Sequence, residues 1–300
     1  MAMNIGFVYP PQSAPHGRVI ALHCSGSSSS EWGHLTQALG GRYEVAAPEH
    51  YGAQGTGPWG GEHAFTLDDE AVRSIALIDA RDDDKVHLVG HSYGGGVALN
   101  IALARPDRIA SMVLYEPTAF HLLRQLGERG AEPYAEITGV ARSICQGVVT
   151  GDYRGAVAAF VDYWNGPGAW NALRPAVQSA LIRWAPKGPL DFRALIDDPT
   201  PADAYRRLTF PVLILRGEHA PSPTRAVAEG LLEYLPASGL AVIAGAGHMG
   251  PLTHSMEVSA LIVRHILQAD SNADTLPYRG PRRNGSDIAG TARQRTEAPS

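Results

Sequence analysis

Apolar runs of strand length alternate with longer segments of helical periodicity, and this alternation constrains the fold more than any other feature of the sequence. The strands are predicted at residues 18–24, 43–48, 85–90, 108–115, 211–217 and 239–244. The helices are predicted at residues 31–39, 67–80, 93–104, 224–234 and 255–267. Because strands separated by helices pair in parallel, we expect an α/β fold with a mostly parallel central sheet and helices on both faces.

One long segment interrupts this alternation. Residues 119–208 contain no convincing strand but carry helical patterns, which lie at residues 120–127, 134–149, 155–164 and 177–184. We therefore expect a helical cap or lid at 119–208, inserted into a core formed by residues 1–118 and 209–268. Trp164, Trp170 and Trp184 lie in this insertion, where they either fill its own core or line a substrate pocket.

The C-terminal segment and the net charge each support one further expectation. From residue 269 to 300 the composition becomes polar and rich in Gly, Pro and Arg, so we expect a disordered tail. The chain has 25 Lys and Arg against 30 Asp and Glu, a net charge of −5. This balance lacks the one-sided basic field that nucleic acids or anionic membranes attract. We expect a small-molecule substrate, with no nucleic-acid or membrane partner, and leave a homodimer open.

Cysteine usage and the first residues favour a cytoplasmic location and no bound metal. Cys24 and Cys145 are far apart and match no metal-ligand or redox spacing. The first residues show no basic segment followed by an apolar core, and no apolar run approaches the length of a membrane span. We therefore expect a reduced, cytoplasmic protein with no metal and no cofactor.

A G-x-S-x-G motif lies between a predicted strand and a predicted helix. Gly90, Ser92 and Gly94 occupy its fixed positions, which is the strand–turn–helix context in which the motif carries a nucleophile. The glycines allow a turn too tight for a Cβ, and the turn projects the serine hydroxyl at the carboxyl edge of the sheet, where open α/β folds bind ligands. Ser92 is therefore the candidate nucleophile, the alternative being a glycine-rich packing turn.

Over roughly residues 15–268 the chain resembles the α/β-hydrolase family. The motif around Ser92 carries the resemblance, together with a His-initiated loop after the first predicted strand, which begins at His23. The resemblance implies that the backbone N–H groups of Ser25 and Tyr93 form an oxyanion hole. Cys24 stands where glycine is usual in the family, and a flexible capped turn is the other interpretation of the serine-rich loop.

The family's catalytic histidine follows the last strand, and His248 occupies that place in the run Gly-Ala-Gly-His-Met-Gly. A hydroxyl needs a base that is neutral near physiological pH to remove its proton, which imidazole provides. The same run matches the dinucleotide fingerprint G-x-G-x-x-G. No second strand–helix unit follows it, however, so a nicotinamide or flavin site is not expected.

The third member of a catalytic triad is where the sequence departs from the family pattern. The usual carboxylate position, after the penultimate strand, is Ala220. The family has a second location, at the end of the strand that follows the nucleophile's helix, and Glu116 lies there. Glu116 is therefore the expected acid. The alternatives are Glu218, another carboxylate such as Asp198, or no third member at all.

A serine nucleophile in this family implies acyl transfer. We expect a serine hydrolase that forms an acyl-enzyme from a small, largely apolar carboxylic ester, with thioesters, lactones and C–C bonds also open. Side chains expected to line the substrate site are His23, Trp164, Trp170, Trp184 and Met249. Two other classes stay open: a non-catalytic ligand-binding protein, which the missing acid at position 220 makes more plausible, and a cofactor-free oxygenase, lyase or perhydrolase on the same scaffold.

Overall fold

The structure, a computed structural model, describes residues 15–53, 55–81 and 85–274. Its core is one six-stranded sheet in the order β2-β1-β3-β4-β5-β6, with every neighbouring pair parallel. The strands are β1 (Gly17–Leu22), β2 (Tyr43–Ala46), β3 (Val86–His91), β4 (Ile109–Tyr115), β5 (Val212–Gly217) and β6 (Ser238–Ile243). The predicted α/β class and all six predicted strands are confirmed, with ends that differ by one or two residues.

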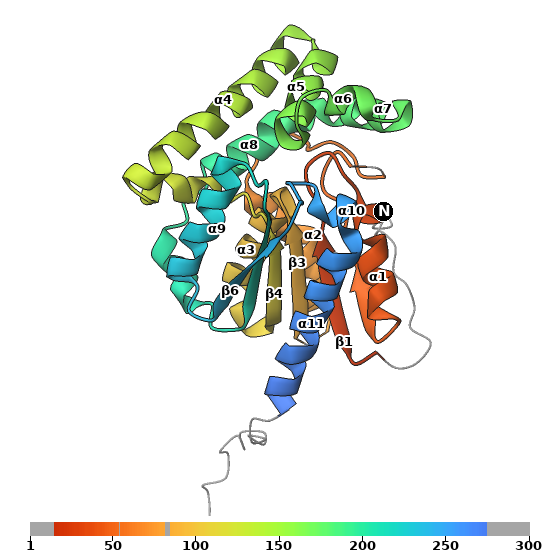
Figure 1. Ribbon diagram of the computed structural model, residues 1–300, viewed down its shortest axis with the longest axis vertical. Helices are drawn as coiled ribbons and strands as arrows, with labels where there is room; N and C mark the ends of the chain where they lie inside the picture. Colours follow the sequence, from red (N-terminus) through yellow and green to blue (C-terminus); the bar gives the residue numbers. More distant parts are fainter. Residues whose placement is uncertain (1–14, 54, 82–84, 275–300) are drawn as a thin grey trace, which may run out of the picture.

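Helices cover both faces of this sheet (Figure 1). The α-helices are α1 (Gly33–Leu39), α2 (Leu67–Asp79), α3 (Tyr93–Ala104), α4 (Glu128–Thr150), α5 (Tyr153–Asn165), α6 (Ala169–Ala172), α7 (Pro175–Trp184), α8 (Gly188–Ile196), α9 (Ser222–Tyr234), α10 (Gly250–Thr253) and α11 (Ser255–Asp274). In the part of the chain that the structure describes, the 3₁₀ helices are η1 (Ser29–Trp32), η2 (Pro106–Arg108), η3 (Phe120–Gln125), η4 (Ala185–Lys187) and η5 (Ala202–Arg207). Helices α2, α3 and α9 pack on one face, and α1 and α11 pack on the other.

Side-chain alternation along the strands explains this two-sided packing. In β1, Ile20 and Leu22 belong to the larger apolar cluster under α2, α3 and α9, whereas Val19 and Ala21 belong to the cluster under α1 and α11. Successive residues of a strand point to opposite faces, so a strand that is apolar throughout must be covered on both sides. All four side chains are at most 1% exposed.

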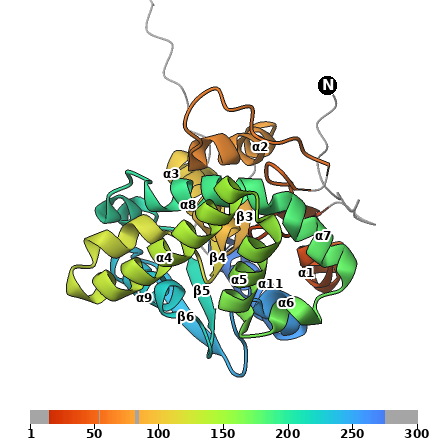
Figure 2. The ribbon, with the colours of Figure 1, turned by 90° about the horizontal axis from the view of Figure 1, so that it is seen from above.

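The sheet order reverses direction between β1 and β3, because β2 lies on one side of β1 and β3 on the other. In open α/β sheets this switch point, at the carboxyl ends of the strands, is where ligands bind. The segment 119–208, which we call the cap, contains helices and no strand, and η3, α4 and α5 begin it. Figure 2 shows α4, α5 and α8 lying across the carboxyl edge of the sheet. The cap therefore covers the region in which the switch point lies.

Two of the helical segments that differ from the sequence-based expectation are α8 and α11. Helix α8 was not predicted, because Pro186, Gly188 and Pro189 at its start are typical of a turn. Proline is tolerated in the first turn of a helix, where its missing N–H has no partner to lose, and both Gly188 and Pro189 lie there. Helix α11 runs past Leu267 to Asp274. The expectation of a disordered tail from residue 269 is therefore wrong for residues 269–274, which belong to α11, and its residues 275–300 lie outside the described residues.

Candidate active site

Ser92 lies on the sharp turn between β3 and α3. Its backbone angles are φ 54° and ψ −117°, a conformation that non-glycine residues rarely adopt. A Cβ built on Gly90 would lie 2.5 Å from the carbonyl oxygen of Gly94, and a Cβ on Gly94 would lie 2.3 Å from that of Leu22. Both positions therefore require glycine, and the turn holds the Ser92 side chain at the end of the strand.

His248 follows β6 and lies within hydrogen-bonding distance of Ser92. The Ser92 hydroxyl can donate to His248 Nε2 at 2.9 Å, and the two residues are 7% and 3% exposed. Two side chains from the ends of β3 and β4 hold the loop that carries His248. Tyr115 donates its hydroxyl to the carbonyl of Gly247 at 2.7 Å, and His91 Nε2 lies 2.8 Å from the carbonyl oxygen of His248 itself.

Glu116 completes the arrangement from the end of β4. Its Oε2 accepts from His248 Nδ1 at 2.7 Å and from the hydroxyl of Thr224 at 2.9 Å, and its Oε1 accepts the backbone N–H of Gly217 at 2.9 Å. Glu116 is fully buried and has φ 42°. Among the described residues, Ser92 and Glu116 are the only non-glycine residues with positive φ. The structure thus brings Ser92, His248 and Glu116 into one chain of hydrogen bonds.

The protonation states in this chain follow from burial and from these contacts. Burial lowers the pKa of His248, because it disfavours the charged imidazolium, and the contact with Glu116 opposes this effect without cancelling it. Burial alone would raise the pKa of Glu116, yet the hydrogen bonds and charge of His248 outweigh it and the pKa is lowered. At neutral pH Glu116 is therefore ionised and His248 is neutral, with its free Nε2 lone pair directed at Ser92.

The alternative acids are engaged elsewhere. Glu218 is exposed and accepts the backbone N–H of Gly245 at 2.8 Å, so it stabilises the loop before His248. Asp198 accepts the backbone N–H of Thr200 at 2.8 Å in the cap. Ala220 is buried and bears no functional group. Of these positions and Glu116, Glu116 is the one whose carboxylate the structure joins to His248.

The expected oxyanion-hole residues lie on two adjoining loops. Ser25 is in the loop after β1, and Tyr93 is the first residue of α3. The close approach of Gly94 to Leu22 and His23 packs the start of α3 against that loop. Neither the Ser25 nor the Tyr93 amide makes a hydrogen bond within the part of the chain that the structure describes. Both amides are therefore free to donate, and that of Tyr93 also lies at a helix N-terminus, which favours an anion.

The tryptophans expected to line the substrate site lie in three different environments. Trp164 stacks on His248, with ring centroids 4.1 Å apart and planes inclined by 26°. Trp184 donates its indole N–H to Asp191 at 3.2 Å and packs over Gly26. Trp170 belongs to an apolar cluster of the cap itself and stacks with Arg154. Trp164 is thus the tryptophan in contact with the catalytic candidates.

His23 and Met249 complete that set. The imidazole of His23 lies between Glu49, at 3.1 Å from its Nε2, and the carbonyl oxygen of Cys24, at 2.8 Å from its Nδ1. It is 1% exposed, so it braces the loop after β1. Met249 directly follows His248 and is half-buried.

Sequence reasoning missed a buried pair of side chains, Glu31 and His91, behind the triad. Glu31 Oε1 lies 2.7 Å from His91 Nδ1, and both side chains are fully buried. Burial alone would raise the pKa of Glu31, but the neighbouring His91 holds it at about 2. Glu31 also accepts the backbone N–H of Cys24 at 3.2 Å. The pair therefore joins the loop after β1 to the loop of His248, a connection that no local motif encodes.

Comparison with known proteins shows the family to which the chain belongs. A model of the family described as "Alpha/beta hydrolase family" matches residues 19–261. The chain belongs to the α/β-hydrolase family. Its relatives include Lipase LipV of Mycobacterium tuberculosis, 37% identical over 100 residues that cover 33% of this chain and 37% of the lipase. They also include a pimeloyl-[acyl-carrier protein] methyl ester esterase of Aeromonas hydrophila, 26% identical over 81% of this chain and 93% of the esterase.

Solved structures show the same fold as this α/β-hydrolase. The enol-lactonase from Burkholderia xenovorans LB400 superposes with a TM-score of 0.68 at 14% identity, covering 87% of this chain and 95% of the lactonase. A thermophilic esterase from Thermogutta terrifontis superposes with a TM-score of 0.65 at 18% identity, covering 86% of this chain and 92% of the esterase. Among the first curated relatives, the match spans about two fifths of their length, 37% for the lipase and 38% for the protein named "Putative carbamate hydrolase RutD" of Caulobacter segnis.

One buried group of this α/β-hydrolase has the composition of a metal site. Ligand atoms of Cys24, Glu31 and His91 lie within 4.8 Å of one another. A metal would need the Cys24 thiolate, but burial raises the pKa of that thiol well above its ordinary value. Glu31 and His91 are moreover bonded to each other. The donor set therefore fits an internal hydrogen bond better than a bound metal cation.

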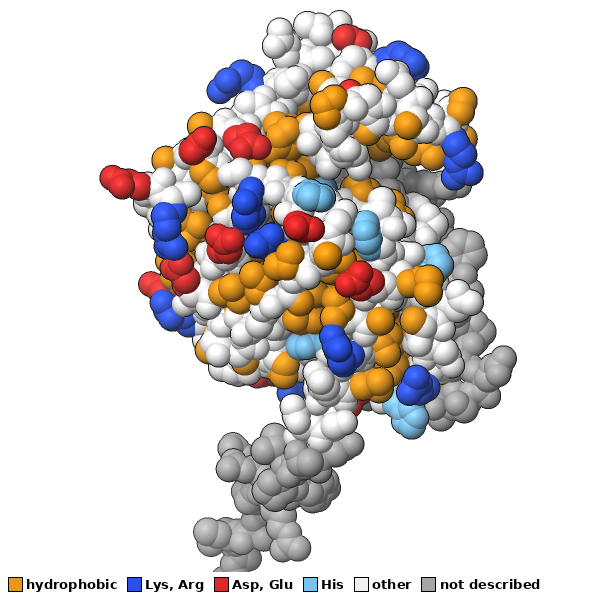
Figure 3. Space-filling view, in the orientation of Figure 1, with side chains coloured by type: hydrophobic (Ala, Val, Ile, Leu, Met, Phe, Trp, Pro, Cys, Tyr) orange, Lys and Arg blue, Asp and Glu red, His pale blue; other side chains and the backbone are white. Residues whose placement is uncertain are grey.

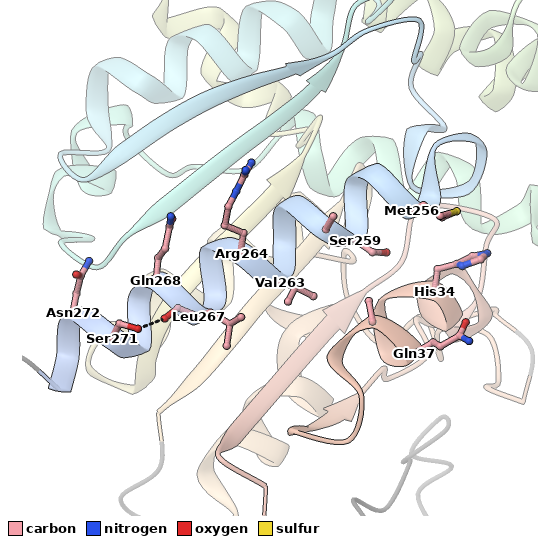
Figure 4. Close-up of a pocket in the computed structure, with 12 residues that line it drawn as sticks. His34, Gln37, Met256, Ser259, Val263, Arg264, Leu267, Gln268, Ser271 and Asn272 are labelled. Atoms are coloured by element: carbon pink, nitrogen blue, oxygen red, sulfur yellow. Dashed lines mark hydrogen bonds between the residues drawn. The ribbon is translucent and has the colours of Figure 1, made fainter.

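The outer surface of the α/β-hydrolase carries an open groove between α1 and α11. It has a volume of about 1040 Å³, and Figure 4 shows His34, Met256 and Arg264 among its lining side chains. None of the triad residues lines it. On the face shown in Figure 3, basic and acidic side chains are interspersed. Within the described residues no helix combines the length and apolar character that a membrane span requires.

Proposed function

We propose that this protein is a serine hydrolase that cleaves a small, largely apolar carboxylic ester through an acyl-enzyme. The observation that carries the proposal is the unbroken chain from the Ser92 hydroxyl through His248 to Glu116, with distances of 2.9 and 2.7 Å. Nucleophile, base and orienting carboxylate in that geometry are the recurring arrangement for acyl transfer. Membership of the α/β-hydrolase family supports the same reaction class.

The proposed reaction has two stages. Ser92 Oγ attacks the ester carbonyl carbon while its proton passes to His248 Nε2, and the carbonyl oxygen becomes an oxyanion that accepts from the amides of Ser25 and Tyr93. As the intermediate collapses, the C–O bond to the alcohol breaks and His248 returns the proton to the departing oxygen. Water then attacks the acyl-enzyme with His248 again as base, which releases the carboxylic acid and restores Ser92.

Glu116 orients the base in this scheme. Its ionised carboxylate accepts from His248 Nδ1, so the imidazole presents the unprotonated Nε2 to Ser92. The same carboxylate stabilises the imidazolium that forms when Ser92 loses its proton. The contacts from Gly217 and Thr224 fix Glu116 so that it cannot rotate away.

The cap supports an apolar substrate. Trp164 covers His248, and Phe160 and Tyr163 pack against Trp164 with ring centroids 6.1 and 4.7 Å away. Such aromatic walls bind an apolar acyl or alcohol group. A small carboxylic ester is therefore the preferred substrate, while thioesters, lactones and activated C–C bonds use the same nucleophile and oxyanion chemistry.

The test is turnover of p-nitrophenyl acetate and butyrate by the wild type and Ser92→Ala, with fluorophosphonate labelling of both. We expect wild-type turnover and labelling, and a loss of both in Ser92→Ala with an unchanged circular dichroism spectrum. Ser30→Ala, on an exposed hydroxyl near the same site, is the matched control and should behave as wild type. A wild type that resists the probe and cleaves neither ester would favour a non-catalytic binding protein. Labelling without ester turnover would favour a lyase, perhydrolase or cofactor-free oxygenase.

A further inference from the structure

A buried charge cluster joins the cap to the core beside the candidate active site. We call it the Lys187 cluster; its members are Lys187, Asp191, Glu70, Tyr93 and Ser25. Lys187 and Asp191 belong to the cap, in η4 and the first turn of α8, while Glu70 lies in α2 of the core. The Lys187 ammonium lies 2.8 Å from Glu70 Oε2 and also contacts Asp191 Oδ1. The three charged side chains are at most 5% exposed.

Each carboxylate of the cluster accepts a hydroxyl from one of the two oxyanion-hole candidates. Ser25 Oγ donates to Asp191 Oδ2 at 2.7 Å, and Tyr93 Oη donates to Glu70 Oε2 at 2.8 Å. The ammonium of Lys187 lies between these two carboxylates. A single cap side chain is therefore connected, through one carboxylate on each side, to both residues whose backbone amides are the proposed oxyanion donors.

Further contacts make this cluster rigid. The second oxygen of Glu70 accepts the backbone N–H of Tyr51 at 2.9 Å, and Asp191 also accepts the indole N–H of Trp184 at 3.2 Å. The Lys187 ammonium lies over the rings of Phe65 and Tyr93, 4.4 and 4.9 Å from their centroids. Buried charges that are fully paired in this way keep one geometry, because any displacement leaves a charge without a partner.

Positioning of an oxyanion hole demands this kind of rigidity. An amide stabilises the oxyanion only when its N–H lies about 2.7–3.1 Å from the position the oxygen takes in the transition state. Ser25 lies in a turn after β1, and its side-chain bond to Asp191 ties that turn to α8. At Tyr93, the bond to Glu70 ties the first turn of α3 to α2.

We propose that the Lys187 cluster fixes the positions of the two backbone amides that form the oxyanion hole. Lys187 and Asp191 of the cap are then positioning residues for the reaction, and the hole is complete only when the cap is docked on the core. The inference rests on the proposed function. It assigns the cap a part in transition-state stabilisation in addition to its contact with the substrate.

The decisive variant is Ser25→Ala, which removes the hydroxyl and keeps the backbone amide. We expect kcat for p-nitrophenyl butyrate to fall about 10- to 100-fold with KM within about twofold, because a misplaced donor affects the transition state and not substrate binding. Ser25→Thr, which restores a hydroxyl, should recover most of the loss. Ser30→Ala, on an exposed hydroxyl of the same serine-rich loop, should retain wild-type kcat.

Inhibition by 1,1,1-trifluoropentan-2-one separates positioning from a merely structural role. Ser92 Oγ forms a bond to its carbonyl carbon, the proton passes to His248, and the carbonyl oxygen becomes an oxyanion that needs the hole. We expect its Ki in Ser25→Ala to rise by the factor by which kcat/KM falls, while the Ki of butyrate, a ground-state product, changes little. Equal changes in both Ki values, or none in either, would overturn the proposal.

Variants of Lys187 test the connection itself. Lys187→Met leaves the buried carboxylates of Glu70 and Asp191 without the ammonium that neutralises them and should destabilise the fold, so Asp191→Asn, which keeps a hydrogen-bond acceptor, is made alongside it. In Asp191→Asn the additional effect of Ser25→Ala on kcat should be smaller than in the wild type, because both changes act on one connection. Fully additive effects would contradict the proposal.

A wild type without turnover or labelling removes the proposed function itself, whereas an active wild type with an unaffected Ser25→Ala removes this inference alone.

Discussion

Ser92 and Glu116 hold backbone conformations that cost free energy for any residue with a Cβ, about 1–2 kcal/mol each. Both follow directly from strands, β3 and β4, that lie side by side in the sheet. The backbone N–H of Ser92 donates to the carbonyl of Tyr115, and that of Glu116 donates to the carbonyl of Leu215. The sheet's own hydrogen bonds therefore continue through these two residues and sustain the strained turns that direct their side chains towards His248.

Glu116→Gln tests the displaced acid. The amide can still accept from Gly217, but it cannot stabilise the imidazolium or hold the correct tautomer of His248, so kcat/KM should fall about 10³- to 10⁴-fold. Ester turnover by the two forms measures the effect. The matched control is Glu218→Gln, at the exposed carboxylate on the neighbouring loop, for which we expect activity within about threefold of wild type. An unaffected Glu116→Gln would remove Glu116 from the triad.

The pH dependence of activity follows from the lowered pKa of His248. Because His248 must be neutral to accept the proton of Ser92, activity is lost as pH falls through its pKa. Burial places that pKa below the ordinary 6.5, so the midpoint of the decline in kcat/KM should lie below pH 6.5. Initial rates across pH 4.5–8.5 give the midpoint. A midpoint above 6.5 would show that Glu116 outweighs burial.

Local sequence was sufficient for the triad candidates and insufficient for what surrounds them. Ser92 is marked by its two glycines, and His248 and Glu116 by their places after strands, which the family resemblance supplied. Asp191 and Glu31 carry no such mark. Their partners lie far along the chain, 166 residues away for Ser25 and Asp191 and 60 for Glu31 and His91. Such pairs arise from tertiary packing, which periodicity and turn rules do not describe.

At the scale of elements, the regular core was predictable and the cap was predictable only in part. The strands are apolar throughout, and α3 begins directly after the nucleophile, so their limits were clear. Helix α8 starts within a Pro-Lys-Gly-Pro sequence that local rules interpret as a turn. What makes it a helix is packing. Leu195 fits against Gly96 of α3, where a Cβ would come within 2.7 Å of the leucine side chain.

Helix α5 places Trp164 against His248, and its substitution should change acyl selectivity. In Trp164→Leu the smaller side chain leaves room beside the imidazole, so longer acyl chains should gain. With about 0.8 kcal/mol for each additional buried methylene, the ratio of kcat/KM for octanoate to that for acetate should rise roughly tenfold or more. A p-nitrophenyl ester series measures this ratio.

The control for that prediction is Trp170→Leu. Trp170 packs within the cap's own cluster with Val157 and Leu181, so its loss should lower the melting temperature and leave the acyl preference unchanged. If both substitutions changed stability alone, Trp164 would not border the acyl site.

At the scale of the whole molecule, buried ionised carboxylates join segments that are distant in sequence. Glu31, Glu70 and Glu116 each have a pKa below the ordinary value: burial alone would raise it, and a histidine or lysine partner outweighs burial. A carboxyl whose pKa is lowered in the folded state stabilises that state above the unfolded pKa, and the stabilisation is lost as pH falls towards the folded value. The fold should therefore be sensitive to acid.

For Glu31 the pKa falls from 4.5 to about 2, which predicts that about 2 kcal/mol of its contribution to the free energy of unfolding is lost between pH 7 and pH 3. Urea unfolding at pH 7, 5, 4 and 3 measures the dependence. Glu31→Gln should be less stable at pH 7 and show a shallower slope. Glu44→Gln, which breaks a surface ion pair with Arg81, should change stability little at any of these values. Identical slopes in wild type and Glu31→Gln would contradict the assignment.

The three residues of the triad come together from distant parts of the chain, since its two hydrogen bonds join residues 156 and 132 positions apart. Closing such long loops is slow, and parallel strands cannot form by zipping a hairpin. No fragment that lacks β6 holds His248 at the edge of the sheet. During refolding, the far-ultraviolet circular dichroism signal would return first and esterase activity last. The rate at which activity recovers therefore measures the rate at which the final strand docks.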